Sequence, residues 1–202
     1  MNDKKKLLND QLLKSINEEN PDTDNYLVPD EISKKARSLM SIKSDLGDAH
    51  AALTELSLMH LMPGGIETIM TALWKSGIVT YGKCFTNSND GQSKLEIKDC
   101  FIDHEYFIGI HNSLINIRNG FIAHRGDNEF EDTVMIMKVD PKNPNETTYD
   151  MKSFRAGTSN FHNLVDYLNV IEHLQQYVEL GIQKQIQKIH DRIYSDGNSK
   201  SD

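Results

Sequence analysis

Residues 159–194 read SNFHNLVDYLNVIEHLQQYVELGIQKQIQKIHDRIY, in which an apolar side chain recurs at every third or fourth position. That spacing places the apolar residues on one face of an α-helix. At 1.5 Å per residue, a helix of about 36 residues is roughly 50 Å long, whereas a globular chain of this size has a radius of gyration of only about 16–17 Å. We therefore expect the far end of this helix to pack on another body, most simply a second copy of the chain.

Further helices are predicted upstream of this segment. Apolar residues at helical spacing predict one helix over about 31–61, a second over 66–84, and a third that begins near Asp99 and reaches Arg118 or beyond. Residues 4–17 form either a short amphipathic helix or a loosely docked arm. The acidic, proline-containing segment that follows them is predicted to be a connector.

The pattern changes after Arg125. Residues 133–139 and 147–154 have the composition of strands and are separated by a turn-rich stretch, which predicts a β-hairpin over about 131–155. The predicted fold class is therefore mainly α: an up-and-down helical bundle with an inserted β-hairpin and a long C-terminal helix. The predicted division of the chain is an N-terminal arm and connector at 1–30, a helical domain at 31–194 and a disordered tail at 195–202.

The charge of the chain limits how it could bind nucleic acid. Of its 202 residues, 22 are Lys or Arg and 30 are Asp or Glu, which gives a formal net charge of −8. Proteins that coat nucleic acid without sequence preference usually carry a basic surface, because phosphate neutralisation supplies most of their affinity. The charge therefore excludes such coating over the whole surface, but it leaves room for one small basic site.

The sequence also bears on location. No apolar run is long enough to cross a membrane, and the basic N-terminus lacks the apolar stretch of a secretory signal. Cys84 and Cys100 form neither a CxxC motif nor a disulfide framework, which suits a reducing compartment. We therefore expect a cytoplasmic protein without a membrane partner.

The most informative segment is residues 106–126, which contain no acid although they belong to an acidic chain. His104, His111 and Arg118 are seven residues apart and lie along one edge of the apolar face of the predicted helix. A guanidinium at such a position needs a partner, because burying an unpaired charge is costly. One interpretation is a satisfied polar seam, in which the histidines bond to the backbone and the arginine pairs with an acid from a neighbouring helix.

A second interpretation comes from residues 114–126, which read LINIRNGFIAHRG. Their Arg118-Asn119-x4-His124 pattern resembles the signature of the HEPN (higher eukaryote and prokaryote nucleotide-binding) superfamily, and the wording around it is similar to the abortive-infection and toxin branch. The resemblance implies a metal-independent endoribonuclease that works as a homodimer, with the motifs of both subunits facing one cleft. It also implies an RNA substrate, neutralisation by a partner antitoxin, and neither a metal nor a cofactor.

The chemistry of such cleavage assigns roles to the motif. A base must take the proton of a 2′-OH that attacks the adjacent phosphate, an acid must protonate the leaving 5′-oxygen, and a cation must stabilise the phosphorane. His124 is predicted to be the acid or base, Arg118 to hold the phosphate and Asn119 to orient the phosphate or the histidine. The 2′-OH requirement would limit the enzyme to RNA. The predicted substrate-binding residues are Arg125, His111 and Lys83.

The spacing within the motif sets a geometric condition. Six residues on an ideal helix amount to 600°, so Arg118 and His124 would point about 120° apart. Either the helix breaks between them, for which Gly120 is well placed, or the site is shared across the twofold axis of a dimer.

Three alternatives stay open at this point. The chain could be a non-catalytic, dimeric HEPN-like module that binds RNA, a nucleotide or a partner protein. A metal site could use Asp103, His104 and Glu105, but His104 and His111 are two turns apart, unlike the one-turn spacing of helical metal ligands. A nucleophilic enzyme based on a cysteine would lack an evident histidine and acid partner.

Overall fold

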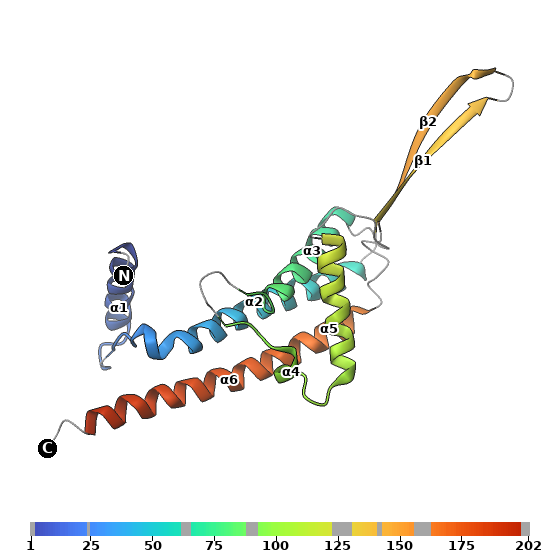
Figure 1. Ribbon diagram of the computed structural model, residues 1–202. Helices are drawn as coiled ribbons and strands as arrows, with labels where there is room; N and C mark the ends of the chain where they lie inside the picture. The colour runs from blue at the N-terminus through green and yellow to red at the C-terminus, as the bar shows by residue number, and fades with distance from the viewer. Residues whose placement is uncertain are drawn as a thin grey trace.

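The computed structural model describes residues 3–23, 25–61, 66–87, 93–122, 131–140, 143–155 and 163–198. The fold is mainly α-helical, with one β-hairpin and a long C-terminal helix, as the sequence predicts (Figure 1). The elements are α1 (Asp3–Glu19), α2 (Asp30–His60), α3 (Glu67–Lys83), α4 (Ile97–Cys100), α5 (Glu105–Ile117), a π-helical turn η1 (Arg118–Ile122), β1 (Glu131–Asp140), β2 (Asn143–Arg155) and α6 (Leu164–Asn198).

Helix α2 is the central helix of the bundle, because it packs along both α3 and α6 (Figure 1). Its buried apolar residues recur every three or four positions and so form one face; they are Ala36, Leu39, Ile42, Leu46, Ala49, Leu53 and Leu56. Helix α6 presents the matching face to them, with Leu164, Tyr167, Val170, Ile171, Leu174, Val178 and Ile182 buried. The predicted periodicity of both helices is confirmed.

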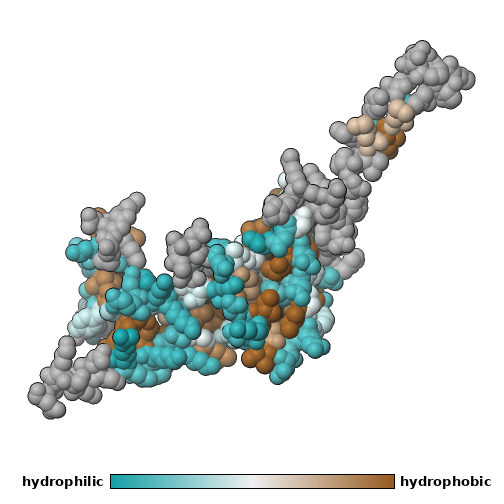
Figure 2. Space-filling model, in the orientation of Figure 1, coloured by the Kyte–Doolittle hydropathy of each residue, from teal (hydrophilic) through white to brown (hydrophobic). Residues whose placement is uncertain are grey.

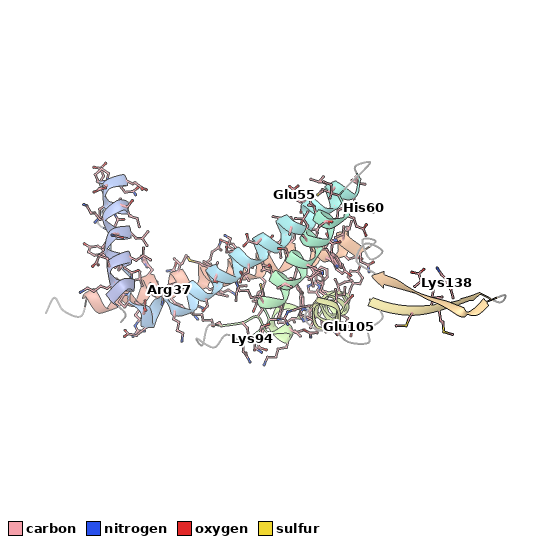
Figure 3. All side chains as sticks on the ribbon, turned by 90° about the horizontal axis from the view of Figure 1, so that it is seen from above. Arg37, Glu55, His60, Lys94, Glu105 and Lys138 are labelled. Carbon is pink, nitrogen blue, oxygen red and sulfur yellow. The ribbon has the colours of Figure 1, made fainter. Side chains whose placement is uncertain are left out.

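Helix α5 differs in direction from its neighbours. It runs across α2, α3 and α6, and it is therefore seen nearly end-on in the view from above (Figure 3). The three long helices lie roughly along one another, as in an up-and-down bundle, while α5 closes one side of them. Leu114 and Ile117 of α5 are buried against this side.

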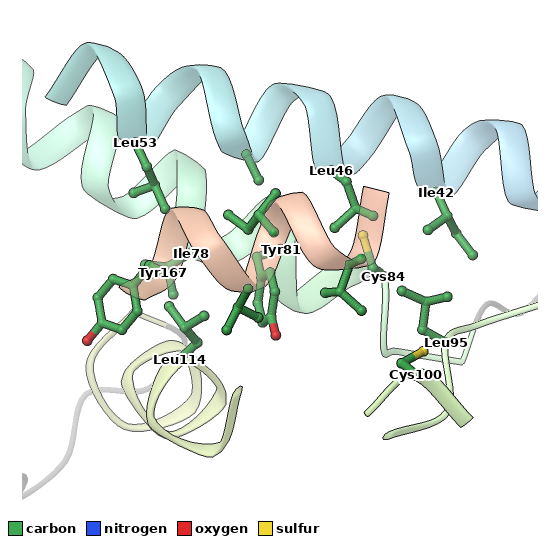
Figure 4. Packing of buried hydrophobic residues seen from close by; sticks show 14 of the residues in the cluster. Ile42, Leu46, Leu53, Ile78, Tyr81, Cys84, Leu95, Cys100, Leu114 and Tyr167 are labelled. Atoms are coloured by element: carbon green, nitrogen blue, oxygen red, sulfur yellow. The ribbon is translucent and has the colours of Figure 1, made fainter. Parts of the chain in front are cut away.

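The core lies where these four helices meet (Figure 4). Trp74 of α3 and Tyr167 of α6 are both fully buried, and their ring centroids are 5.7 Å apart. The close approach of α2 and α3 depends on Gly77, since a Cβ at this position would lie only 2.7 Å from Cδ2 of Leu53. A glycine here lets the leucine side chain rest directly on the backbone of α3.

The segment before α5 corrects one prediction. The sequence indicated a single helix from about Asp99, whereas the structure has the short helix α4 and then a break before α5 begins at Glu105. Asp103 takes a φ of 61°, in the left-handed region, which an α-helix cannot contain. Aspartate is one of the few residues other than glycine that adopt this conformation at little cost.

The predicted β-hairpin is present. Strands β1 and β2 pair antiparallel, with Met135 opposite Met151 and Lys138 opposite Thr148. The hairpin projects away from the helical bundle (Figure 1). The side chains of Met135 and Met137 are exposed, and Lys138 forms an ion pair with Asp150 at 3.0 Å.

The two ends of the chain extend from the bundle. Helix α6 continues to Asn198, so residues 195–198, which we predicted to belong to a disordered tail, are helical. Helix α1 is also formed, and four of its apolar residues are exposed: Leu7, Leu8, Leu12 and Ile16. Figure 2 shows hydrophobic surface, drawn in brown, on this part of the molecule. In the part of the chain that the structure describes, no helix is long and apolar enough to span a membrane.

Candidate functional site

Arg118 stands where the α-helical part of α5 ends. The next turn, Arg118–Ile122, is π-helical, so its backbone bonds reach five residues back and the turn is wider than in an α-helix. π-Helical turns are rare and occur frequently at functional sites. The predicted break at Gly120 is not observed within this turn: the helix widens and continues to Ile122.

The side chain of Arg118 lies on the backbone of α3. Gly82 is buried beneath it, and a Cβ at this glycine would come within 2.9 Å of Nε and 3.5 Å of Cγ of the arginine. Because glycine has no side chain, the aliphatic part of Arg118 can cross α3 at this point. The position of the guanidinium is therefore set by α3 as well as by α5.

Arg118 and Asn119 form a polar pair. Nη1 of Arg118 donates a hydrogen bond to Oδ1 of Asn119 at 3.1 Å. Among the described residues, no carboxylate lies within 4 Å of the half-buried guanidinium. The acid from a neighbouring helix that a satisfied polar seam would require at Arg118 is thus absent from the described part of the chain. Arg118 remains a cation able to receive an anion.

His111 occupies the interior instead of the surface. Its side chain is 2% exposed, and Nδ1 is 2.8 Å from the hydroxyl oxygen of Tyr81. Burial lowers the pKa of His111 to about 4 and raises the pKa of Tyr81 far above its usual value, so the tyrosine O–H donates to a neutral imidazole. The ring also packs against Phe85, with centroids 4.3 Å apart.

The position of His111 bears on its predicted role in binding substrate. A ligand at the surface cannot touch this imidazole, because Tyr81 and the aromatic rings around it close the site. The histidine therefore fits the interpretation as a satisfied polar group, although its partner is a tyrosine side chain and not the backbone that we expected.

Lys83 is exposed but already paired. Its Nζ donates to Oδ1 of Asp45 on α2 at 2.7 Å, and this bond raises the pKa of the lysine. Lys83 follows Gly82 directly, and it is turned toward α2 while Gly82 faces Arg118. Its predicted contact with a phosphate would require this ion pair to open.

His124 and Arg125 lie outside the described residues, so the structure places only Arg118 and Asn119 of the predicted motif. These two residues are brought together, while His111 and Lys83 point elsewhere. Sequence reasoning missed Gly82 and the π-helical turn. The only sequence signal for the former is a glycine in the interior of a predicted helix, which indicates a close approach of backbone without naming the partner.

The structure gives little support to the two other candidate sites, a metal site and a cysteine nucleophile. Within the described ranges, no three His, Cys, Asp or Glu side chains gather in a way that could hold a metal ion. His104 stacks on Phe107, and its neighbour His173 bonds the backbone oxygen of Cys100 at 2.8 Å. Cys84 and Cys100 are buried, and burial raises the pKa of both thiols to about 12, so neither supplies a reactive thiolate.

Comparisons with protein-family models, with curated proteins and with solved structures found no significant match to this chain. The case for a function therefore rests on the residues of the site and on the resemblance carried by residues 114–126.

Proposed function

We propose that the protein is a metal-independent endoribonuclease of the HEPN type, acting as a toxin or phage-defence factor. One observation carries the proposal: Arg118 is a half-buried cation without a carboxylate partner among the described residues, and it lies beside the amide of Asn119 on a π-helical turn. An arginine that merely completed a polar seam would have an acid next to it, because an uncompensated charge at such a position is costly.

The proposed reaction uses three groups. The 2′-oxygen of the RNA attacks the adjacent phosphorus, and the bond from phosphorus to the 5′-oxygen breaks. The proton of the 2′-OH passes to a base and the leaving 5′-oxygen receives one from an acid, which leaves a 2′,3′-cyclic phosphate and a 5′-hydroxyl. His124 performs one of these transfers, and His124 of the second subunit performs the other. Arg118 binds the phosphate oxygens, whose negative charge grows in the transition state.

A homodimer is part of the proposal. Helix α6 extends along and beyond α2, and Ile186 and Ile193 near its end are 50% and 47% exposed. Exposed apolar residues on one side of a long helix favour contact with a second copy. An antitoxin partner follows from the resemblance to HEPN toxins, and a cytoplasmic location is proposed from the cysteine usage of the sequence.

The test is cleavage of a structured RNA by the purified protein in excess EDTA. We expect wild-type protein to leave 2′,3′-cyclic ends, and His124→Ala and Arg118→Ala to lose activity by 100-fold or more, which is on the order of what one acid–base or oxyanion contact supplies. Arg118→Lys keeps the charge but not the forked donors, so partial activity is expected. His50→Ala serves as the matched control, because His50 pairs with Glu172 on the α2–α6 surface.

Two outcomes of this experiment would contradict the ribonuclease proposal. A wild-type protein that remains a dimer but does not cut RNA in EDTA would overturn the ribonuclease proposal and favour the non-catalytic binding module. Activity that EDTA abolishes and a divalent metal restores would favour a metal enzyme.

A further inference from the structure

A basic groove of about 500 Å³ lies between the start of α2 and the C-terminal half of α6. Four cations line it: Lys34 and Lys35 come from α2, and Lys188 and Arg192 come from α6. The two segments that contribute its residues are the beginning of α2, drawn in blue in Figure 1, and the end of α6, drawn in red. The groove is remote in sequence from Arg118 and belongs to different helices.

The charge of this groove is opposite to that of the whole chain. Among the described residues that line it, Glu31 is the only acid, so these residues contribute four cations and one carboxylate. In the part of the chain that the structure describes, none of the four cations has a carboxylate within 4 Å. Two other cations of α2 are paired with carboxylates: Arg37 with Asp30 at 3.0 Å and Lys43 with Glu179 at 2.6 Å. In a chain with a net charge of −8, these four cations thus lie together without a carboxylate partner among the described residues.

The lining of the groove indicates what could occupy it. Ile32 and Ile189 are its apolar residues, and no aromatic side chain is among the lining residues that the structure describes. Binding sites for protein segments usually contain large apolar or aromatic anchors, and sites that read nucleotide bases use aromatic stacking. A groove lined by cations and without either feature suits a nucleic-acid strand that is contacted through its phosphates.

We propose that this groove binds the phosphate backbone of single-stranded RNA, as a second contact for the substrate outside the Arg118 site. The inference rests on the proposed ribonuclease function for its choice of RNA as the polyanion. Because the contacts are to phosphates, binding is independent of base sequence and depends steeply on salt. The groove holds substrate and takes no part in the bond-breaking step.

Binding is measured with a fluorescein-labelled 2′-O-methyl oligonucleotide, which keeps the phosphates and has no free 2′-OH to react. The groove variant is Lys34→Gln with Lys188→Gln, and the matched control is Lys43→Gln with Lys98→Gln, which removes two charges outside the groove. Full-length proteins are compared by fluorescence anisotropy between 50 and 200 mM salt. Near-identical circular dichroism spectra establish that both variants are folded.

We expect the groove variant to lose about tenfold in affinity at the lower salt concentration. The slope of log K against log salt should fall by about 1.4, since each phosphate contact to a single strand contributes about 0.7. The control should stay within twofold of wild type. Equal losses in both variants would mean a response to net charge and would overturn the proposal, as would an unchanged slope. Tighter binding of a labelled poly-glutamate peptide than of RNA, lost in the groove variant, would assign the groove to an acidic protein and also overturn it.

Cleavage kinetics separate this inference from the proposed function. If both hold, the groove variant should raise KM about tenfold while kcat stays within twofold, because the groove does not touch the reacting phosphate. A wild-type protein that binds RNA through the groove yet never cuts it would overturn the ribonuclease proposal and support the groove. Equal kcat/KM for RNA cleavage in wild type and in the groove variant would overturn the proposed role of the groove and leave the ribonuclease proposal intact.

Discussion

Gly82 of α3 lies directly beneath the side chain of Arg118. The arginine belongs to the π-helical turn after α5, and its side chain extends from there across the backbone of α3. This contact ties the candidate phosphate-binding residue to the core of the bundle through α3. Any side chain at position 82 would have to displace the arginine or the helix.

Gly82→Ala is therefore expected to move Arg118 and to lower RNA cleavage by tenfold or more. In most helix interiors the same change would stabilise the protein by up to about 1 kcal/mol. Gly47→Ala in α2 is the matched control, because a Cβ there meets nothing within 4 Å. Steady-state cleavage of RNA and urea unfolding of both variants make the comparison. Full activity in Gly82→Ala would show that the position of Arg118 is not critical.

The buried pair of Tyr81 and His111 predicts a dependence of stability on pH. Burial lowers the folded-state pKa of His111 from 6.5 to about 4, so the unfolded chain binds a proton more readily between these values. The contribution of His111 is fully present above pH 6.5 and is lost as the pH falls toward 4. Protonation of His111 in the unfolded chain should therefore make the free energy of unfolding about 2 kcal/mol lower at pH 5 than at pH 7.

Urea unfolding at pH 7 and pH 5 tests this dependence. His111→Gln retains an acceptor for the Tyr81 hydroxyl and does not titrate, so its stability should fall less over the same range. If the free energy of unfolding falls equally in wild type and variant between pH 7 and pH 5, groups other than His111 cause the loss of stability.

The contact between Leu53 and Gly77 predicts a large effect of truncation. Leu53 is fully buried, and its side chain lies on the backbone of α3. Leu53→Ala should lower the free energy of unfolding by about 2–5 kcal/mol, because the packed helices can only partly fill the space. Leu58→Ala, on the same helix but with the leucine 50% exposed, should change it by less than about 1 kcal/mol. Chemical denaturation monitored through Trp74 measures both.

The proposed dimer predicts a change of mass on mutation of the end of α6. Wild-type protein should sediment at about 46 kDa, twice the 23.0 kDa of one chain. Ile186→Glu with Ile193→Glu places two charges on exposed apolar positions that lie two turns apart, and it should give a monomer. Lys184→Gln with Lys188→Gln lowers the net charge by the same two units, but at exposed positions about 160° around the helix from Ile186, and should leave the dimer intact. A monomeric wild type would rule out the shared site.

Several elements could be predicted because their residues repeat with a clear period. The buried positions of α2 and α6 follow helical spacing, and the hairpin follows from two strand-like segments around a turn-rich stretch. No such repeat indicates the break at Asp103. Its positive φ cannot be predicted from the residue type, because most aspartates do not adopt the left-handed conformation. The same holds for the extent of α6, where Asp196 and Gly197 indicated an end that the helix passes.

The candidate site was harder to predict than the fold. The motif names Arg118 and Asn119, which are consecutive in the sequence and share a hydrogen bond, while its histidine lies outside the described residues. Spacing along α5 could not show that His111 turns inward, because its position depends on Tyr81 and Phe85 from α3 and the turn after it. The basic groove joins residues about 150 positions apart in the sequence, and no local pattern connects Lys34 with Lys188. Both features are products of tertiary packing.

The projecting hairpin has a consequence for how the protein behaves at high concentration. In the part of the chain that the structure describes, no third strand pairs with β1 or β2, so both edges present backbone donors and acceptors that another molecule could extend into a larger sheet. Charged side chains at such edges oppose this kind of association. Lys138, beside the exposed Met137, is placed to act in that way. In this region solubility, more than folding stability, is therefore the property that sequence changes would alter first.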